Sequence, residues 1–323
     1  QLVEYCYDVS PMYDAREYDA IVSSGEQVTA GLLALALQKR GLTARSWQGW
    51  QVPLKTDGTH AKARIEGIET TDLKKRLGEN EIAVLAGFQG ITDQGRISTL
   101  GRGGSDTTAV ALAAALGADR CDIYTDVKGV YTTDPRIEPK ARMLPEVSYE
   151  EMLEMASVGA KVLQTRSVEM AMKERVSVQV LSSFEDPVGS DLPGTLLVDE
   201  DKMMEKQVVN SVTYSRDDAK ITLRNVPDIP GVAARVFGPL AEAAVNVDVI
   251  VQNISPDNKA TDMTFTVPES DLEKTLEVLK EIKKELGGEV EVISSPDVVK
   301  ISVIGIGMRS HAGVAQTMFQ TLS

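Results

Sequence analysis

The chain has 323 residues, and its 42% hydrophobic and 25% charged residues are typical of a globular protein with two or three domains. Its net charge of −14 and its pI of about 4.8 argue against nucleic acid as a partner, because phosphate backbones are bound by clustered Lys and Arg and the sequence has no such stripe. We find no signal peptide and no apolar run that approaches the ~20 residues needed to span a bilayer, so we expect no membrane partner.

The cysteines and histidines offer no metal site or disulfide framework. Cys6 and Cys121 have no Cys-x-x-Cys spacing, and His60 and His311 lie far apart without a helical His-x-x-x-His pair. We therefore expect a cytoplasmic protein without disulfides and without protein ligands for a metal. Each histidine is interpreted as a surface or hydrogen-bonding residue.

The first third of the chain alternates predicted helices and strands. Helices are predicted for residues 28–39 and 71–77, and strands for residues 43–47 and 82–88. The continuous apolar run of the last segment is typical of a buried parallel strand. Because the first 20 residues lack the strand that normally opens a doubly wound domain, we expect the native protein to begin before Gln1.

The helix over residues 28–39 is expected to bury its leucines, which are Leu32, Leu33, Leu35 and Leu37. Glu26 falls in the first turn of this helix, where the helix dipole favours a carboxylate. That is one interpretation of Glu26, and the ammonium group of a ligand is the other.

Residues 101–108, Gly-Arg-Gly-Gly-Ser-Asp-Thr-Thr, form a glycine loop in front of a predicted helix that Gly117 ends. Ser105, Asp106 and Thr107 are residue types that cap helix N-termini, and the N–H groups there suit an anion. Arg102 adds a planar donor for a carboxylate or a phosphate. A carboxylate in such a site must meet a cation, so Asp106 indicates an ammonium group, a lysine or a magnesium ion. For the loop alone, an ordinary capped helix is the alternative.

A further strand is predicted for residues 122–127, so strand, glycine loop, helix and strand follow one another in an α/β order. Ligands in such folds gather at the carboxyl ends of the strands. Residues 88–90, the glycine loop and Thr125-Asp126 are therefore expected to face one crevice. The hydroxyl-rich segment 124–136 follows the strand, and its Tyr131 and Arg136 are available to a base or a phosphate.

Five stretches, residues 23–26, 86–90, 100–108, 124–136 and 159–163, occur in the order and at the spacings typical of aspartokinases. Together they resemble the amino-acid kinase domain of that family, with a mainly parallel sheet sandwiched by helices, over residues 19–197. The resemblance implies that Arg102 clamps the α-carboxylate of aspartate, that Glu26 meets its ammonium group, and that Ser105 lines the transfer site. Asp106, Arg102 and Lys161 are the implied catalytic residues.

The resemblance further implies ATP and Mg²⁺ as cofactors. The implied nucleotide-binding residues are Arg102, Gly103, Gly104, Ser105, Thr125, Asp126, Tyr131, Asp134, Arg136 and Lys161. The family's N-terminal Lys-Phe-Gly-Gly loop has no match, so we expect this chain alone to be inactive. Smaller departures are Gln164-Thr165, where His-Pro is common, and Lys128, where an acidic residue or proline is common.

The chemistry agrees with these residue types. A β-carboxylate is already ionised at neutral pH, so it attacks phosphorus without a general base. Phosphoryl transfer instead requires alignment and cancellation of charge by Mg²⁺, Lys, Arg and backbone N–H groups. Neither a Walker loop nor a Rossmann dinucleotide turn is present in the sequence.

The C-terminal part carries an internal repeat. Residues 220–223 and 300–303 each read as a strand, and each precedes a glycine, Gly231 or Gly313, that opens a predicted helix. In the first copy the expected apolar helix face consists of Ala233, Val236, Phe237, Leu240, Ala241 and Ala244. Strands over residues 245–254 and 261–267 and a helix with Leu272, Leu276, Leu279, Ile282 and Leu286 complete a βαββαβ order.

This order resembles tandem ACT domains, which are ligand-sensing modules. Their implied effector positions are Asp228, Ile229, Pro230, Gly231, Val232, Ala233, Asn246, Val247, Asp248 and Gln252. Residues 308–314 form the matching loop of the second copy. A purely structural α+β module is the alternative.

The two resemblances imply an aspartate kinase with a catalytic domain at residues 1–198, a linker at 199–210, a first ACT domain at 211–295 and an incomplete second one at 296–323. We expect ATP-dependent phosphorylation of the L-aspartate β-carboxylate, the first step toward lysine, threonine and methionine, feedback by lysine or threonine or both, and a homodimer or higher oligomer formed through the ACT domains. The alternatives are another amino-acid kinase, acting on glutamate or a carbamate, and a catalytically silent effector-binding partner.

Overall fold

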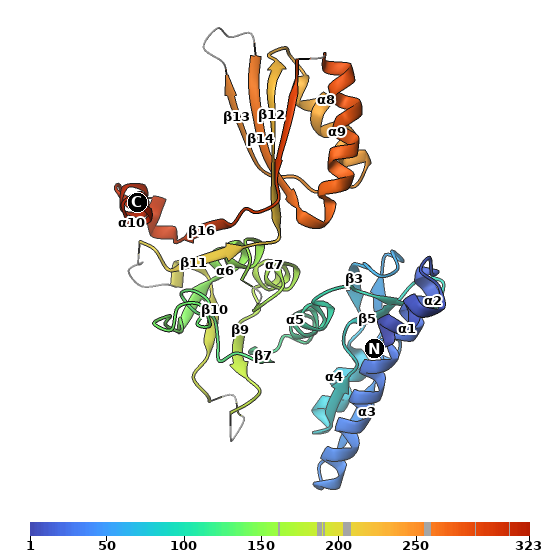
Figure 1. Cartoon of the computed structure of the whole chain (residues 1–323). Coiled ribbons are helices and arrows are strands. Elements are labelled where there is room, and N and C mark those ends of the chain that lie inside the picture. Colours follow the sequence, from blue (N-terminus) through green and yellow to red (C-terminus); the bar gives the residue numbers. More distant parts are fainter. Residues whose placement is uncertain are drawn as a thin grey trace. The chain divides into compact units, whose positions relative to one another are not determined.

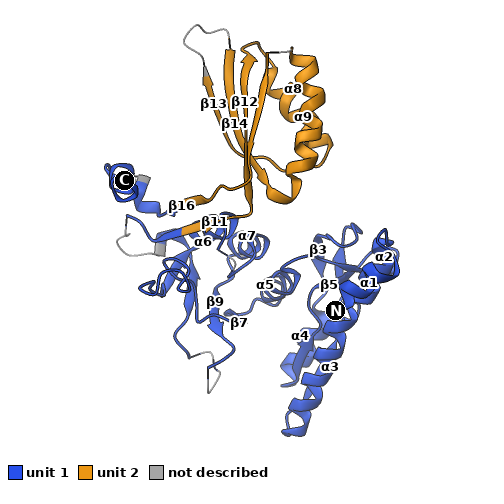
Figure 2. Ribbon diagram, viewed as in Figure 1, with its two compact units in different colours: residues 1–212, 303–323 blue, residues 213–302 orange. Residues whose placement is uncertain are grey.

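The computed structural model describes residues 1–160, 162–185, 189, 191–202, 208–254, 260–287, 289–309 and 311–323. It divides into two compact units (Figure 2): unit 1 comprises residues 1–212 and 303–323, and unit 2 comprises residues 213–302. The sequence-based domain limits stay a prediction.

Unit 1 begins with three helices, α1 (Leu2–Val9), α2 (Ala15–Val22) and α3 (Ser24–Lys39). Helix α3 packs against the parallel pair β1 (Ala44–Trp47) and β4 (Ile82–Leu85), and α4 (Thr71–Gly78) also contacts β4. A mixed sheet follows, in the order β3 (Ile65–Ile68), β2 (Leu54–Thr56), β5 (Gln89–Ile91) and β6 (Ile97–Thr99). The expected helices and strands of this region are confirmed to within a few residues, apart from the strand predicted for residues 82–88, which ends at Leu85.

Helix α5 (Gly104–Leu116) leads from this region to the second sheet of unit 1 (Figure 1). That sheet has the order β7 (Cys121–Thr125), β9 (Val178–Ser182), β10 (Thr195–Val198) and β8 (Glu146–Ser148), with β7 parallel to β9 and β8 parallel to β10. Helices α6 (Tyr149–Ser157) and α7 (Thr165–Glu174) cover it and bury Met152, Met155 and Ala171 in the main core. The predicted α/β class with parallel strands is confirmed.

Two expectations about burial in unit 1 are wrong. Leu32, Leu33 and Leu35 are more than half exposed, because α3 turns its small residues Ala30 and Ala34 toward the protein interior. Strand β4 is parallel as expected, but its Ile82 is exposed because β4 pairs with β1 alone in a two-stranded sheet.

Helices α2 and α3 together form a helical run, Ala15–Lys39, that is 25 residues long and apolar enough to cross a membrane by length and composition. This corrects the expectation that no segment approaches that length. The run is apolar because the leucines of α3 follow one another without a charge between Glu26 and Lys39. Such a pattern also occurs in soluble proteins, and this run contacts β1, β4 and β6.

Helix α5 begins at Gly104, so Ser105, Asp106 and Thr107 lie inside its first turn and do not cap it, contrary to expectation. The N-cap residue is Gly103, which has a left-handed φ of 71° and therefore favours glycine. At the other end Gly117 is left-handed with φ 68°, and its N–H donates to the carbonyls of Ala113 and Ala114, as predicted.

Unit 2 is the predicted βαββαβ module. Its elements are β12 (Asp218–Pro227), α8 (Val232–Glu242), β13 (Asp248–Ile254), β14 (Ala260–Pro268), α9 (Leu272–Leu286) and β15 (Glu291–Ser295). The strands form an antiparallel sheet in the order β13-β14-β12-β15, and both helices cover one of its faces (Figure 1).

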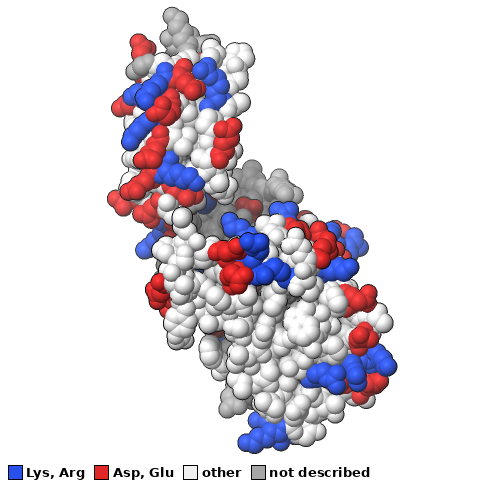
Figure 3. Space-filling model, turned by 90° about the vertical axis from the view of Figure 1, so that its right-hand side faces the viewer, with Lys and Arg blue, Asp and Glu red and all other residues white. Residues whose placement is uncertain are grey.

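The core of unit 2 contains the predicted Val236, Leu240, Leu279, Ile282 and Leu286. Two further residues of the predicted apolar face, Ala241 and Ala244, are exposed; Ala244 lies beyond the end of α8 at Glu242, and Ala241 lies in its last turn. Figure 3 looks onto the helix-covered side of this unit, where acidic and basic side chains are intermixed.

The repeat that the sequence indicates is confirmed by a second strand, loop and helix. Strand β16 (Lys300–Ile304) pairs with β11 (Ser211–Ser215), and α10 (Val314–Leu322) begins after Gly313, as α8 begins after Gly231.

Candidate functional site

The glycine loop in front of α5 is closely packed. A Cβ atom on Gly101 would lie 2.9 Å from the carbonyl oxygen of Ala61, and one on Gly103 would lie 2.0 Å from Cγ of Gln164. Both glycines also have left-handed φ angles, of 77° and 71°. The loop is therefore restricted to glycine by conformation and by space, and the side chain of Arg102 between them is exposed.

Hydrogen bonds extend this packing into the first turn of α5. The hydroxyls of Thr107 and Thr108 donate to the carbonyls of Gly103 and Gly104, at 3.0 and 2.7 Å. The Thr108 hydroxyl also accepts from the N–H of Phe88 at 3.1 Å, and the N–H of Leu100 donates to the Phe88 carbonyl at 2.9 Å. The predicted meeting of residues 88–90 with the glycine loop is thus confirmed for Phe88.

Asp106 lies in the first turn of α5 and is only partly exposed. Burial raises the pKa of its carboxyl group above the ordinary value. The pKa of the Cys121 thiol, on the next strand, is raised to about 11. Burial is the largest cause, and the negative charges of Asp122 and then Asp106 add to it. A partly desolvated carboxylate at a helix N-terminus, where the dipole favours an anion, is suited to hold a cationic group.

Arg166 of α7 fixes the residue before the loop. Its guanidinium donates to the carbonyl of Leu100 at 2.8 Å and to the carbonyl of Ala63 at 2.7 Å. Desolvation lowers the pKa of Arg166 from its ordinary value. The sequence analysis did not single out Arg166, because a basic residue on an amphipathic helix normally indicates a solvated face.

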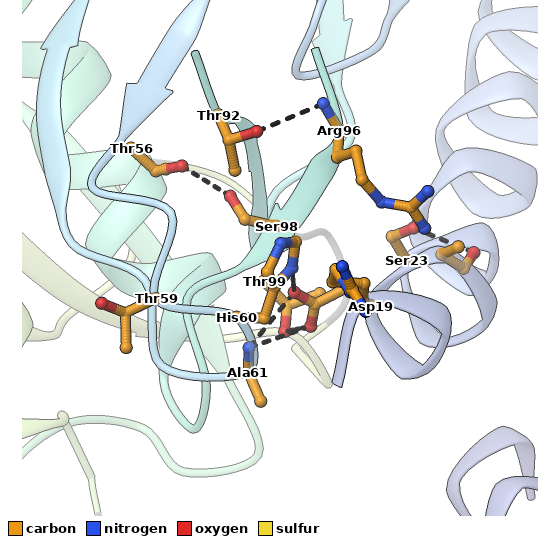
Figure 4. A network of polar contacts seen from close by, with 12 residues as sticks. Asp19, Ser23, Thr56, Thr59, His60, Ala61, Thr92, Arg96, Ser98 and Thr99 are labelled. Carbon is orange, nitrogen blue, oxygen red and sulfur yellow. Dashed lines mark hydrogen bonds and ion pairs between the residues drawn. The ribbon is translucent and has the colours of Figure 1, made fainter. Parts of the chain in front are cut away.

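A second set of polar contacts surrounds Asp19 of α2 (Figure 4). The fully buried carboxylate accepts from Nδ1 of His60 at 2.6 Å, from the N–H of Ala61 at 3.1 Å and from the hydroxyl of Thr99 at 2.5 Å. His60 is therefore the hydrogen-bonding histidine that one of the two interpretations predicts. The sequence signal for Asp19 was weak, since it consists of one carboxylate within the stretch Tyr-Asp-Ala-Ile-Val.

Glu26 lies in the first turn of α3, as predicted. The start of this helix is tied to β5 through the buried Gln89, whose amide donates to the Ser23 carbonyl at 3.2 Å and accepts from the side chain of Gln27 at 3.0 Å. Gln89 therefore connects the helix of Glu26 to the strand that follows Phe88.

The predicted nucleotide residues beyond the glycine loop lie after β7. The Thr125 carbonyl accepts from both the N–H and the hydroxyl of Ser183. Tyr131 forms an isolated bridge with Met143, and Asp134 and Arg136 form an ion pair of 2.8 Å. This pairing lowers the pKa of Asp134, and it engages the guanidinium that the sequence left available for a phosphate.

Among the described residues, no hydrogen bond joins Thr125 or Asp126 to the glycine loop. Lys161, the remaining predicted catalytic residue, lies outside the described residues. The segment after β7 is held instead by the buried Thr195, whose hydroxyl accepts from the N–H of Val130 at 2.7 Å and donates to the Leu144 carbonyl at 2.6 Å.

The predicted effector residues of unit 2 lie in two places. The first group occupies the loop between β12 and α8 and the first turn of α8: Asp228, Ile229, Pro230, Gly231, Val232 and Ala233. The second group leads into the edge strand β13 or lies on it: Asn246, Val247, Asp248 and Gln252. The two carboxylate oxygens of Asp248 accept from the N–H of Val249 and from Nζ of Lys300, each at 2.8 Å, and Lys300 lowers the pKa of Asp248.

Within the described part of the chain, no group of three or more His, Cys, Asp or Glu side chains could hold a metal ion. A magnesium ion bound mainly by phosphate oxygens and water needs few protein ligands, so the residues present are compatible with Mg²⁺ delivered with a nucleotide.

Comparisons with known proteins agree with this geometry. The amino acid kinase family matches residues 2–182, and the ACT domain matches residues 221–284. The aspartate kinase of Pseudomonas putida is 51% identical over 324 residues, which cover 100% of this chain and 77% of that protein.

Two solved structures of E. coli aspartokinase III are also similar, each with 29% identity over 96% of this chain and 68% of the other. The complex with aspartate and ADP has a TM-score of 0.77, and the complex with lysine and aspartate has a TM-score of 0.70. The chain therefore belongs to the aspartate kinases of the amino acid kinase family and carries an ACT domain.

Proposed function

We propose that the enzyme transfers the γ-phosphoryl group of ATP to the β-carboxylate of L-aspartate, giving 4-phospho-L-aspartate, in the cytoplasm and without membrane or nucleic-acid partners. Arg102 binds the α-carboxylate of aspartate, Glu26 binds its ammonium group, and Ser105 lines the transfer site. Asp106 positions a cationic group against the moving phosphoryl group. The similar E. coli enzyme has been solved with aspartate and ADP, which supports this substrate pair.

One observation carries the proposal. The exposed Arg102 lies in the loop before α5, between two positions that only glycine fits, and the partly buried carboxylate of Asp106 lies in the first turn of that helix. The N–H groups of that helix end and Arg102 supply positive potential for two anions, the aspartate and the phosphoryl group. Because the attacking β-carboxylate is already ionised, the site needs no general base, and alignment with charge cancellation performs the catalysis.

Gly103, Gly104 and Ser105, together with Arg102, contact the transferred phosphate in this proposal. The segment after β7, with Thr125, Asp126, Tyr131, Asp134 and Arg136, holds the nucleotide, and Lys161 reaches a phosphate. Mg²⁺, when bound with ATP, neutralises phosphate charge. The product would then be the first intermediate toward lysine, threonine and methionine.

Hydroxamate trapping of the acyl phosphate tests the substrate assignment. With ATP and Mg²⁺, L-aspartate should yield the hydroxamate, whereas L-glutamate and the α-amide of aspartate should require much higher concentrations, because they misplace or lack the group that Arg102 binds. Removal of Mg²⁺ by a chelator should stop the reaction. Equal use of glutamate and aspartate would refute the proposed clamp.

We further propose that unit 2 senses lysine or threonine, or both, and that it joins two subunits. Strand β13 is at the edge of its sheet and exposes Val249, Ile250 and Val251, which suits a paired dimer or a higher oligomer. The E. coli relative solved with lysine supports an amino-acid effector. An effector ammonium group would compete with Lys300 for the carboxylate of Asp248.

Inhibition curves test this regulation. Asp248→Ala or Gln252→Ala should raise the lysine or threonine concentration needed for inhibition while uninhibited turnover stays close to that of the parent. Asn253→Ala is the matched control for Gln252→Ala, because these two successive residues of β13 point to opposite faces. Calorimetric titration that detects neither effector on the intact enzyme would remove the sensor proposal.

A further inference from the structure

Asp19 is a charged group in an unusual place. Its side chain has no exposure to solvent, and a buried carboxylate is costly unless hydrogen bonds replace its water. The replacement bonds come from His60, Ala61 and Thr99, all more than 40 positions away in the chain. Buried ion pairs contribute little to stability on balance, so a purely stabilising role could be filled by apolar residues.

The contacts of Asp19 lead to both halves of the proposed aspartate clamp. In one direction, Asp19 belongs to the helical run Ala15–Lys39, which continues through Ser23 to Glu26. In the other direction, Thr99 ends β6 immediately before Leu100 and the glycine loop with Arg102. One carboxylate therefore connects the helix of Glu26 to the strand that delivers Arg102 (Figure 4).

Ala61 adds a second connection to the same loop. Its N–H donates to Asp19. Its carbonyl oxygen contacts the glycine loop so closely that a Cβ atom on Gly101 would lie 2.9 Å from it. Ala61 itself has a left-handed φ of 63°, a conformation that costs a non-glycine residue about 1–2 kcal/mol. Such strain persists where the surroundings hold it, and here the hydrogen bond to Asp19 and the turn that the Lys62 N–H closes on the Thr59 carbonyl hold Ala61 from both sides.

We propose that Asp19 is a positioning residue for aspartate binding, which sets the location of Arg102 relative to Glu26 through Thr99 and Ala61. This inference rests on the proposed roles of Arg102 and Glu26. Asp19 contacts no substrate. Its effect is to hold two binding groups on separate segments at the separation that the ammonium and α-carboxylate groups of one amino acid require.

The test compares Michaelis constants in the whole enzyme. Asp19→Asn keeps the side-chain shape but replaces an accepting oxygen by an N–H group that faces other donors. It should raise the KM for aspartate about tenfold or more, since misplaced binding groups lose their alignment, and leave the KM for ATP within about twofold. Asp14→Asn, at the exposed N-cap of the same helix, is the matched control and should leave both constants unchanged, because asparagine is an equally good N-cap residue.

A second pair of variants keeps the test decisive if Asp19→Asn folds poorly. Thr99→Val removes the hydroxyl that donates to Asp19 and should reproduce the rise in the aspartate KM, whereas Thr99→Ser retains the hydroxyl and should restore the parent value. A merely structural role predicts equal losses for aspartate and ATP together with a lower melting temperature, and that result would overturn the inference.

Arg102→Lys separates this inference from the proposed clamp. If Arg102→Lys raises the aspartate KM and Asp19→Asn does not, the positioning role fails and the clamp stands. If Arg102→Lys leaves that KM unchanged, the clamp itself fails. In the double variant the two effects should be smaller than the product of the single effects, because both act on the same contact.

Discussion

The glycine-opened helices of the two units share a local design and differ in their surroundings. Gly103 opens α5 and Gly231 opens α8, with left-handed φ angles of 71° and 84° and without a side-chain cap. A Cβ on Gly103 would collide with Gln164, whereas one on Gly231 would meet no described atom within 4 Å.

This difference matches the proposed tasks. We propose that both helix ends bind an anion, but phosphoryl transfer requires a fixed geometry, and the loop of α5 is fixed by Arg166, Phe88 and the contacts of Asp19. A sensor must instead change conformation when it binds its effector, and the loop of α8 has room to do so. Five measurements test this difference between the two loops.

The largest effect is expected from Asp106→Asn. We expect turnover to fall by about 100-fold or more, because the charge that positions the cationic group is lost. Asp119→Asn, exposed just beyond the other end of α5, is the control that should leave turnover unchanged. A turnover near normal in Asp106→Asn would show that this carboxylate only stabilises the helix N-terminus and has no catalytic role.

The same variant makes a prediction about stability with a definite sign. Burial raises the pKa of Asp106 in the folded protein, so its protonated carboxyl group favours the folded state at low pH. This contribution to the free energy of unfolding is lost as pH rises through the pKa of the folded protein. Asparagine cannot ionise, so Asp106→Asn should melt no lower than the parent at pH 7. Thermal unfolding across pH should show the difference shrinking toward pH 4 and below.

Gly103→Ala should destabilise unit 1 by about 2–4 kcal/mol, since it combines a left-handed φ with overpacking against Gln164. Gln164→Ala in the same chain should recover the part of this stability loss that comes from overpacking. The part that comes from the left-handed φ should remain. Hydrogen exchange in α5 under mild denaturant measures both. A cost as small as that of a surface substitution would contradict the fixed loop.

Arg166→Lys should raise the aspartate KM about fivefold, because lysine replaces two fixed donors by one flexible one and about 1 kcal/mol of hydrogen bonding is lost. Arg175→Lys at the end of the same helix is exposed and should have no effect. Steady-state kinetics measure the aspartate KM of both variants. Equal KM values would show that Arg166 does not hold the loop.

Between the two glycine substitutions, the smaller loss of stability is expected from Gly231→Ala. With open space around the added methyl group, only the left-handed φ remains, so we expect about 1–2 kcal/mol in unit 2. Hydrogen exchange in α8 provides the measurement. A loss as large as that of Gly103→Ala would remove the distinction between the two loops.

Periodicity predicted unit 2 well, because its strands alternate and its helices carry one apolar face that points to a single core. Leu279, Ile282 and Leu286 are buried as their spacing indicates. The same rule failed for α3, whose leucines are exposed while Ala30 and Ala34 are buried. Spacing identifies an apolar stripe, but which side faces the protein depends on partners distant in sequence.

Residue type singles out Arg102 and Asp106 as candidate site residues, and the family resemblance adds Glu26; their roles stay predictions. The groups that fix the loop were missed, since Arg166 and Asp19 act on carbonyl, N–H and hydroxyl groups of distant segments. Such contacts leave no local pattern, because the partner of each polar group is set by the fold and not by spacing.

The central claim is that Arg102 in a fixed glycine loop binds the α-carboxylate of aspartate. Calorimetric titration of the whole enzyme with aspartate and, separately, with ADP tests it in Arg102→Lys, with exposed Arg40→Lys as the control. We expect the Kd for aspartate to rise about tenfold or more, because lysine cannot replace a two-toothed contact, and the Kd for ADP to stay within about twofold. Equal weakening of both ligands, or no change for aspartate, would contradict the claim.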